Sequence, residues 1–289
     1  MNAWDKVRNN SGWYRGLLEW VKGDTAFLSV VFSWQLPTAF QRAAWHKQMG
    51  LKVRAGGPAI ELNPSYLSAV AQCGGSLPDV IGRHNPNATF TSRGCIRKCK
   101  FCAVPKTEGD LVELNDWPVR PIICDNNLLA CSRPHFDDVI DKLKPLSGID
   151  FNQGLDARLL TKYHAGRIAE LDLKMVRLAW DHIGLEGQFN AAWEMLRAAG
   201  IPKAKISAYV LIGYRDTPQD ALYRLRSISE RGSWPNPMRY QPLDAPTRNS
   251  YVGEHWTDAE LKRYMRYWSN LIRLRPVPFE EFRHADARK

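Results

Sequence analysis

Short apolar runs and longer segments with helical periodicity alternate along this sequence from residue 26 to residue 242. The apolar runs predict buried strands, over residues 26–34, 52–55, 89–92, 121–124, 148–152, 174–180, 205–212 and 238–242. In the other segments apolar residues recur at intervals of three and four, which predicts helices over residues 37–49, 64–71, 136–143, 162–171, 188–199 and 218–230. This alternation favours parallel strands joined by helices.

The order of these elements predicts the fold class α/β. The first strand, helix and strand predict a small βαβ, Rossmann-like unit, and the six strands from residue 89 onward predict a partial (β/α)6 TIM-like barrel. Residues 74–88, which are rich in turn signals, predict a linker between the two. We therefore expect domains at residues 1–85 and 86–246, with chemistry at the carboxyl ends of the strands.

The last predicted domain, residues 247–289, contains an amphipathic, basic helix and a tail. Thr257 and Glu260 form a capping box at the start of the helix. An apolar stripe follows, made of Leu261, Tyr264, Met265, Trp268, Leu271 and Ile272. Basic residues lie off this stripe, at Lys262, Arg263, Arg266 and Arg273. They form either a solvated face or a strip that contacts a phosphate backbone.

The composition is that of a globular protein, with 44% hydrophobic and 24% charged residues. A formal net charge of +10 at pH 7 favours contact with polyanions, so a nucleic acid is a candidate partner. No apolar run is long enough to span a membrane, and residues 1–20 lack the apolar stretch of a signal peptide. We therefore expect a cytoplasmic protein without a membrane partner, whose six cysteines serve metal binding or catalysis rather than disulfides.

Three cysteines form the most informative motif of the sequence. Cys95, Cys99 and Cys102 follow a predicted strand, with three and then two residues between them. Thiolates hold iron–sulfur clusters, and a 4Fe–4S cube has four corners, so three ligands leave one iron open to a cofactor or substrate. Cations beside thiols favour the thiolate and offset the charge of a cluster. Here those cations are Arg93, Arg97, Lys98 and Lys100.

A structural zinc site is the alternative interpretation of this motif. Zinc sites combine such cysteines with further ligands elsewhere in the chain, but Cys73, Cys124 and Cys131 are single and scattered. His84 or His135 would have to supply a fourth ligand. The chain would then be a basic nucleic-acid-binding module that contains zinc.

The cysteine motif resembles that of the radical S-adenosylmethionine superfamily, which has the spacing Cys-x3-Cys-x-aromatic-Cys after the first barrel strand. The flanking words SRGC (92–95) and FCAVP (101–105) are similar to the wing that includes the methylthiotransferases and the cobalamin-type members. The resemblance covers residues 89–245. Residues 26–58 are similar to a reduced piece of a cobalamin-type domain, without the Asp-x-His-x-x-Gly that supplies a cobalt ligand. There is no second cysteine cluster, so methylthiotransferase activity is not expected.

The resemblance implies an enzyme with two cofactors, a 4Fe–4S cluster and S-adenosylmethionine. In the superfamily the reduced cluster cleaves S-adenosylmethionine to a 5′-deoxyadenosyl radical, which abstracts hydrogen from a substrate. An electron donor such as flavodoxin or ferredoxin is implied as a partner. The substrate is not identified by the sequence, and the basic charge makes a nucleic acid or nucleotide a candidate. A cobalamin-dependent radical methyltransferase is the alternative activity.

The resemblance also implies site residues around the cysteine loop and the next strand end. The metal ligands would be Cys95, Cys99 and Cys102, with the aromatic Phe101 near adenine. The family often has Gly-Gly-Glu after the second strand, where it binds the methionine amino group. Here that place is occupied by Asp125, Asn126 and Asn127. Their oxygens would take that role, unless they form a plain Asx turn.

Polar and glycine residues at the later strand ends complete the expected site. Gln153 would face the barrel mouth, and Arg158 would pair either with the methionine carboxylate or with Asp156. Asp181 is expected to contact the ribose hydroxyls. Ile212-Gly213 matches the apolar-glycine contact that the family makes with adenine.

Overall fold

The computed structural model describes residues 12–14, 16–270 and 277–283. The chain divides into two compact units: Met1–Arg120 with Gln241–Ser250, and Pro121–Tyr240 with Tyr251–Lys289. The cysteine motif belongs to the first unit, and the expected strand-end residues after residue 121 belong to the second. The compact units divide after Arg120, whereas the domain limits expected from the sequence remain a prediction.

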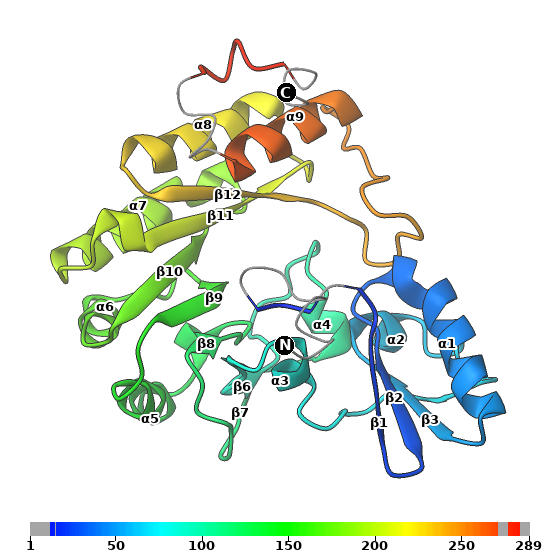
Figure 1. The fold of residues 1–289 in the computed structure, drawn as a ribbon. Helices are drawn as coiled ribbons and strands as arrows, with labels where there is room; N and C mark the ends of the chain where they lie inside the picture. Colours follow the sequence, from blue (N-terminus) through cyan, green and yellow to red (C-terminus); the bar gives the residue numbers. More distant parts are fainter. Residues whose placement is uncertain (1–11, 15, 271–276, 284–289) are drawn as a thin grey trace. The chain divides into compact units, whose positions relative to one another are not determined.

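A four-stranded sheet organises the first unit (Figure 1). Its strands lie in the order β1 (Leu18–Lys22), β2 (Thr25–Ser29), β3 (Lys52–Gly56) and β4 (Gln72–Cys73). Strands β2, β3 and β4 are parallel, whereas β1 pairs antiparallel with β2. The other elements of this unit are α1 (Leu36–Gln48), α2 (Pro58–Leu62), α3 (Val80–His84), β5 (Ala88–Thr89), β6 (Ser92–Arg93), α4 (Val104–Thr107) and β7 (Val112–Glu113).

Helix α1 packs against this sheet through one apolar face. A proline stands in its first turn, where the missing N–H costs no hydrogen bond. Leu36, Ala39 and Ala43 recur at helical spacing and share a buried core with Val53 of β3. The strand, helix and strand expected over residues 26–55 are therefore present, and β1 is an additional strand that the sequence pattern did not predict.

The larger sheet of the protein is mostly parallel and has six strands, in the order β12-β11-β10-β9-β8-β5. Neighbouring strands from β8 to β12 are parallel to one another. In the second unit the strands are β8 (Ile122–Ile123), β9 (Ile149–Leu155), β10 (Leu173–Ala179), β11 (Ile206–Ile212) and β12 (Trp234–Arg239). The helices are α5 (Arg133–Leu143), α6 (Lys162–Ala169), α7 (Glu186–Ala198), α8 (Pro218–Glu230) and α9 (Asp258–Ser269). The fold class α/β is thereby confirmed.

The two faces of the sheet in the second unit differ in chemistry. Helices α5 to α8 lie along one side of it (Figure 1). Phe151 and Val176 are aligned on neighbouring strands, and both are buried. The next residue of β10, Arg177, points to the opposite face, because successive side chains alternate. There it forms an ion pair with Asp150 and a hydrogen bond with Tyr209.

Most elements predicted for the second unit are confirmed. Helix α8 has the predicted bounds, and Thr217 and Asp220 form a capping box at its start. The capping box of Thr257 and Glu260 at the start of α9 is also present. Other bounds shift by a few residues, which is usual where helix and strand ends fray.

The helix expected over residues 64–71 is wrong, because this segment consists of turns. Most of its backbone bonds span three residues, as from the Tyr66 N–H to the Asn63 carbonyl oxygen at 3.1 Å, and a single bond that spans four, from the Ala71 N–H to the Leu67 carbonyl oxygen at 2.9 Å, comes at its end. The Ser68 hydroxyl also donates to the Ser65 carbonyl oxygen at 2.8 Å. Such local side-chain bonds compete with helical hydrogen bonding.

The cations expected on α9 are used within the second unit. Lys262 forms an ion pair with Asp258 at 2.6 Å. Arg263 donates to the carbonyl oxygens of Phe279 and Phe282. These contacts favour a packing role over a strip that binds phosphate. The remaining predicted positions of this helix, Leu271, Ile272 and Arg273, lie outside the described residues.

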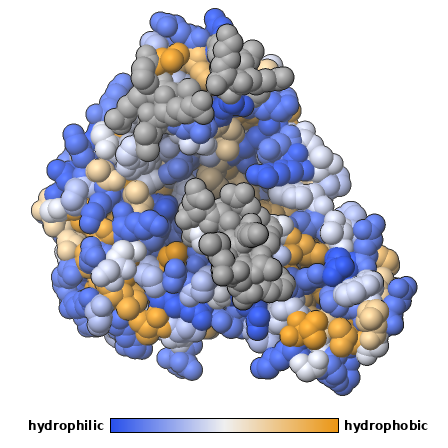
Figure 2. All heavy atoms as spheres, viewed as in Figure 1, coloured by the Kyte–Doolittle hydropathy of each residue, from blue (hydrophilic) through white to orange (hydrophobic). Residues whose placement is uncertain are grey.

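The described part of the face seen in Figure 2 is largely polar. On the face seen in Figure 2, hydrophilic residues predominate, and apolar residues lie in separate groups. Exposed apolar side chains such as Trp45 and Met49 are ordinary on globular proteins. Among the described helices, none is long and apolar enough to cross a bilayer.

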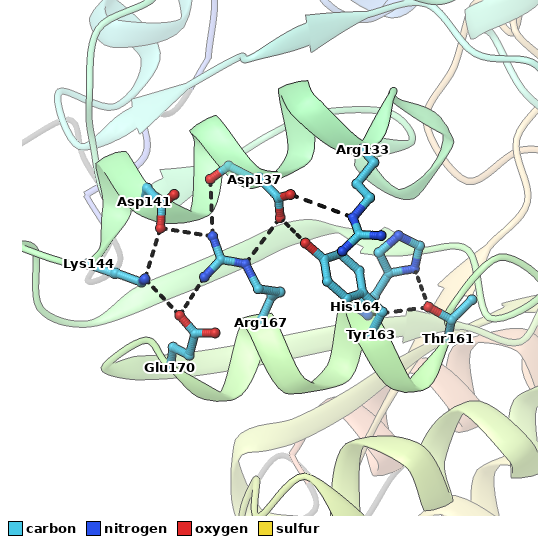
Figure 3. Close-up of polar contacts among 9 residues, drawn as sticks. All are labelled: Arg133, Asp137, Asp141, Lys144, Thr161, Tyr163, His164, Arg167 and Glu170. Atoms are coloured by element: carbon cyan, nitrogen blue, oxygen red, sulfur yellow. Dashed lines mark hydrogen bonds and ion pairs between the residues drawn. The ribbon is translucent and has the colours of Figure 1, made fainter.

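A network of ion pairs joins α5 and α6 on the surface of the second unit (Figure 3). Arg167 is its centre and contacts Asp141 at 2.8 Å, Glu170 at 2.5 Å and Asp137 at 3.1 Å. Hydrogen bonds with Asp141 and Glu170 raise the pKa of Arg167. Arg167 in turn lowers the pKa of Asp141, and Lys144 lowers that of Glu170. The network therefore links α5 to α6, two helices that cover the sheet.

Replacing Arg167 with alanine should lower the midpoint of thermal unfolding at pH 7 by roughly 2–4 °C, because one cation serves three carboxylates. The lowered pKa values of Asp141 and Glu170 mean that this stability is lost as the pH falls through them, so the difference should shrink below about pH 4. Arg133→Ala is the matched control, since Arg133 is exposed and lies 3.8 Å from Asp137. Equal losses in the two variants, measured by calorimetry, would contradict the central role of Arg167.

Candidate functional site

The three motif cysteines lie in one loop of the first unit, between strands β6 and β7. These strands pair antiparallel, with Ser92 opposite Glu113 and Arg93 opposite Val112. The loop therefore begins and ends at neighbouring positions of the backbone. The strand predicted over residues 89–92 is replaced here by two short ones, β5 and β6.

The neck of this loop depends on a glycine and a carboxylate. Gly94 has a φ of 71°, and a Cβ at this position would overlap the carbonyl oxygen of Asp110. Glycine is the residue that tolerates both conditions. The Glu108 carboxylate accepts the Gly94 N–H at 2.9 Å and forms an ion pair with Arg93 at 2.8 Å. The segment directly before Cys95 is thus held against the segment that contains Glu108.

The three thiols of the loop differ in exposure. Cys95 is buried, whereas Cys99 and Cys102 are partly exposed. The Arg97 N–H donates to the Cys95 sulfur at 3.3 Å, and the Cys102 N–H donates to the Cys99 carbonyl oxygen at 3.0 Å. Phe101 lies within this turn and is partly buried. The backbone therefore curls around Cys95 and directs an N–H at its sulfur. In iron–sulfur proteins, hydrogen bonds of this kind tune the reduction potential of the cluster.

Among the described residues, no three His, Cys, Asp or Glu side chains gather closely enough to hold one metal ion. A structural zinc ion needs four ligands around one centre. In a 4Fe–4S cube each cysteine binds a different iron, so the sulfurs need only reach separate corners. All three thiols of the motif lie in this one closed loop.

The other expected site residues lie in the second unit, at the carboxyl ends of adjacent parallel strands. Strand β8 is followed by Asp125, Asn126 and Asn127. Gln153 lies near the carboxyl end of β9, and Asp181 lies two residues after the end of β10. Ile212 ends β11, and Gly213 comes next with a φ of 82°. Because the strands are parallel neighbours, these ends share one edge of the sheet. Asp125, Asn127 and Ile212 are buried, whereas Gln153 is exposed.

Arg158 pairs with Asp156, one of its two expected partners. It donates to both carboxylate oxygens of Asp156, at 2.6 Å and 3.0 Å. A bidentate pair of this kind fixes the orientation of the guanidinium plane. The contact of Arg158 with a methionine carboxylate stays a prediction.

Asp181 is the strand-end residue with the clearest electrostatic signature. Burial raises its pKa to about 6, against the attraction of Arg158 and Arg224, and the nearby Asp156 adds to the increase. The charged form of Asp181 is therefore held in surroundings that disfavour it. Carboxylates in that condition are typical of functional sites.

A buried network behind these strand ends was not expected from the sequence. Arg224 of α8 is fully buried and donates to the Trp180 carbonyl oxygen at 2.8 Å and to the Asp216 carboxylate at 2.7 Å. Asp216 also accepts the Gly213 N–H at 2.9 Å and the Trp256 indole N–H at 3.1 Å. One guanidinium thus ties the end of β10 to the loop after β11. Arg224 and Trp180 are 44 residues apart in sequence, so no local pattern could reveal their contact.

Comparisons with known proteins add no assignment. No protein-family model matches this sequence, and no curated protein matches it significantly. The function must therefore be argued from the cysteine loop and the strand ends.

Asp181→Asn should stabilise the fold at pH 7–8 by about 1–2 kcal/mol, because the amide removes a charge that burial disfavours. The folded-state pKa of about 6 lies above the usual value of 3.8, so the cost is present above pH 6 and disappears as the pH falls below about 4. Urea denaturation across this range measures the effect. Asp172→Asn, at an exposed carboxylate in the same unit, should change nothing. A loss of stability in Asp181→Asn at pH 8 would show that the charge is stabilising.

Proposed function

We propose that this protein is a radical S-adenosylmethionine enzyme that holds a 4Fe–4S cluster on Cys95, Cys99 and Cys102. The observation that supports the proposal is the closed loop that contains all three motif thiols, together with the N–H that is directed at the Cys95 sulfur. When bound, the cluster would supply the electron that cleaves S-adenosylmethionine to a 5′-deoxyadenosyl radical. The radical would abstract hydrogen from a substrate.

The protein's own part is to bind and orient the cofactor. Phe101 and Ile212-Gly213 are the proposed contacts to adenine, and Asp181 is the proposed partner of the ribose hydroxyls. Acceptor oxygens for the methionine amino group come from residues 125–127, and Gln153 and Arg158 complete the polar edge. The pair with Asp156 would keep Arg158 in one orientation before the cofactor binds.

The proposal extends to the fold and the partners. The six-stranded sheet would be a partial (β/α)6 TIM-like barrel, since its strands follow one another in sequence order as barrel strands do. The first sheet would be a reduced Rossmann-like unit that does not bind cobalamin. We propose a cytoplasmic enzyme that receives electrons from a flavodoxin or ferredoxin and acts on a nucleic acid or nucleotide, in keeping with the net charge of +10.

Cys99→Ala tests the cluster assignment. Wild-type protein, reconstituted anaerobically with iron and sulfide, should contain about four irons per chain. With dithionite and S-adenosylmethionine it should release 5′-deoxyadenosine, measured by mass spectrometry. Cys99→Ala should lose the visible absorption of the cluster and at least 100-fold of the product, on the order of the loss caused by removing a required group. Two thiolates are too few to hold the cube.

Cys131→Ala provides the matched control, because Cys131 is a partly exposed cysteine outside the motif. It should keep both the iron and the product. A colourless protein that contains zinc and binds nucleic acid without cofactor would contradict the proposal and favour the zinc module. Cobalamin retained on purification would favour the radical methyltransferase.

A further inference from the structure

The first unit contains a cavity of about 860 Å³ that none of the expected site residues lines. Its lining includes residues that follow β3 and β4, at the carboxyl ends of these parallel strands. Ligands of α/β sheets bind at such ends, in clefts of about 300–1,000 Å³. The cavity therefore has the position and the size of a site for one small molecule.

Two glycine turns form one wall of the cavity. Gly57 follows β3 with a φ of 105°, and Gly75 follows β4 with a φ of 76°. A Cβ at Gly57 would lie 2.7 Å from the carbonyl oxygen of Val30, so only glycine fits there. The backbone itself thus reaches the cavity at this wall.

The two arginines that line the other walls of the cavity are each paired with a carboxylate. Arg120 donates to both carboxylate oxygens of Asp79 at 3.0 Å and to the Ala88 carbonyl oxygen at 2.9 Å. A Cβ at residue 82 would overlap this pair, so Gly82 makes room for it. Arg93 is likewise paired with the Glu108 carboxylate at the neck of the cysteine loop.

Two further carboxylates line the cavity, and no described residue pairs with either of them as a cation. Glu61 and Asp116 are exposed, and neither forms an ion pair with any other residue in the described part of the chain. Among the described residues, the lining contains no lysine, and both of its arginines are paired. The cavity therefore has an excess of negative charge in a protein whose net charge is +10.

Apolar side chains supply the rest of the lining. Leu77 and Trp117 are buried except for their edges, and Phe90 lies under the Arg93 guanidinium, 3.8 Å from its ring centre. Such surfaces accept flat, apolar groups. An anionic ligand would find no unpaired cation among the described lining residues, whereas a cationic one would offset part of the negative charge of Glu61 and Asp116.

We propose that this cavity binds a small organic cation that combines a flat apolar ring with an ammonium group. The ring would lie against the apolar wall, and the ammonium would approach the two carboxylates. The site excludes phosphate-bearing ligands, because their charge would be repelled without compensation. This inference does not depend on the cysteine loop holding a cluster.

Three indole probes of similar shape test the charge preference: tryptamine, which is a cation, 3-methylindole, which is neutral, and indole-3-acetate, which is an anion. Isothermal titration of the full chain should give affinities in that order. Tryptamine should bind roughly tenfold more tightly than 3-methylindole, as expected for two partly solvated charge contacts. Indole-3-acetate should bind most weakly.

Variants locate the binding and identify the carboxylates. Glu61→Gln combined with Asp116→Asn should weaken tryptamine roughly tenfold and leave 3-methylindole unchanged, because the ring contacts remain. Ser76→Trp, at an exposed lining position, should block all three probes. Asp24→Asn, at an exposed carboxylate of the same unit that is paired with Lys52, should bind like the wild type.

Three results would overturn the proposal: equal affinities for the three probes, an unchanged affinity for tryptamine in the double variant, or unchanged binding in Ser76→Trp. None of these results depends on the cluster, so failure here and failure of the proposed function are separate outcomes. The predicted order of affinities, with loss in the double variant, would establish a cation site in the first unit.

Discussion

The neck of the cysteine loop is the constraint on which the functional argument depends. Two segments of backbone approach so closely there that residue 94 can have neither a Cβ nor a negative φ. Glu108 then holds the Gly94 N–H and Arg93 at the same point. The three thiols lie close together in the sequence, and residues of the loop itself hold its two ends together. A glycine and a carboxylate thus hold together the two backbone segments at the base of the loop that contains the thiols.

The second unit contains a carboxylate whose charge is disfavoured by burial, at the edge where the strand ends lie. Asp181 is held where its charge is disfavoured, although Arg158 and Arg224 attract it. Arg224 is itself fully buried, and its contacts with Trp180 and Asp216 keep two strand ends in place. Buried ion pairs of this kind contribute little net stability but fix geometry. Polar residues at this edge are therefore positioned before any ligand arrives, which lowers the entropy cost of binding.

The sequence predicted regular elements well where one face is buried, because burial leaves a repeating apolar pattern, as in α8. It failed at residues 64–71, where apolar residues recur at helical intervals but local serine bonds favour turns. The cysteine trio was recognisable because its members are sequence neighbours. The partners of Arg224 and the carboxylates of the cavity were not, since tertiary contacts between distant residues leave no local pattern.

Electron paramagnetic resonance of the reduced, reconstituted protein tests the central claim most directly. The claim is that three cysteines hold a four-iron cube whose remaining iron is open to S-adenosylmethionine. Saturating S-adenosylmethionine should then shift the g values of the reduced cluster, because its amino and carboxylate groups become ligands of that iron. A fully loaded cluster whose spectrum does not change on this addition would contradict the account.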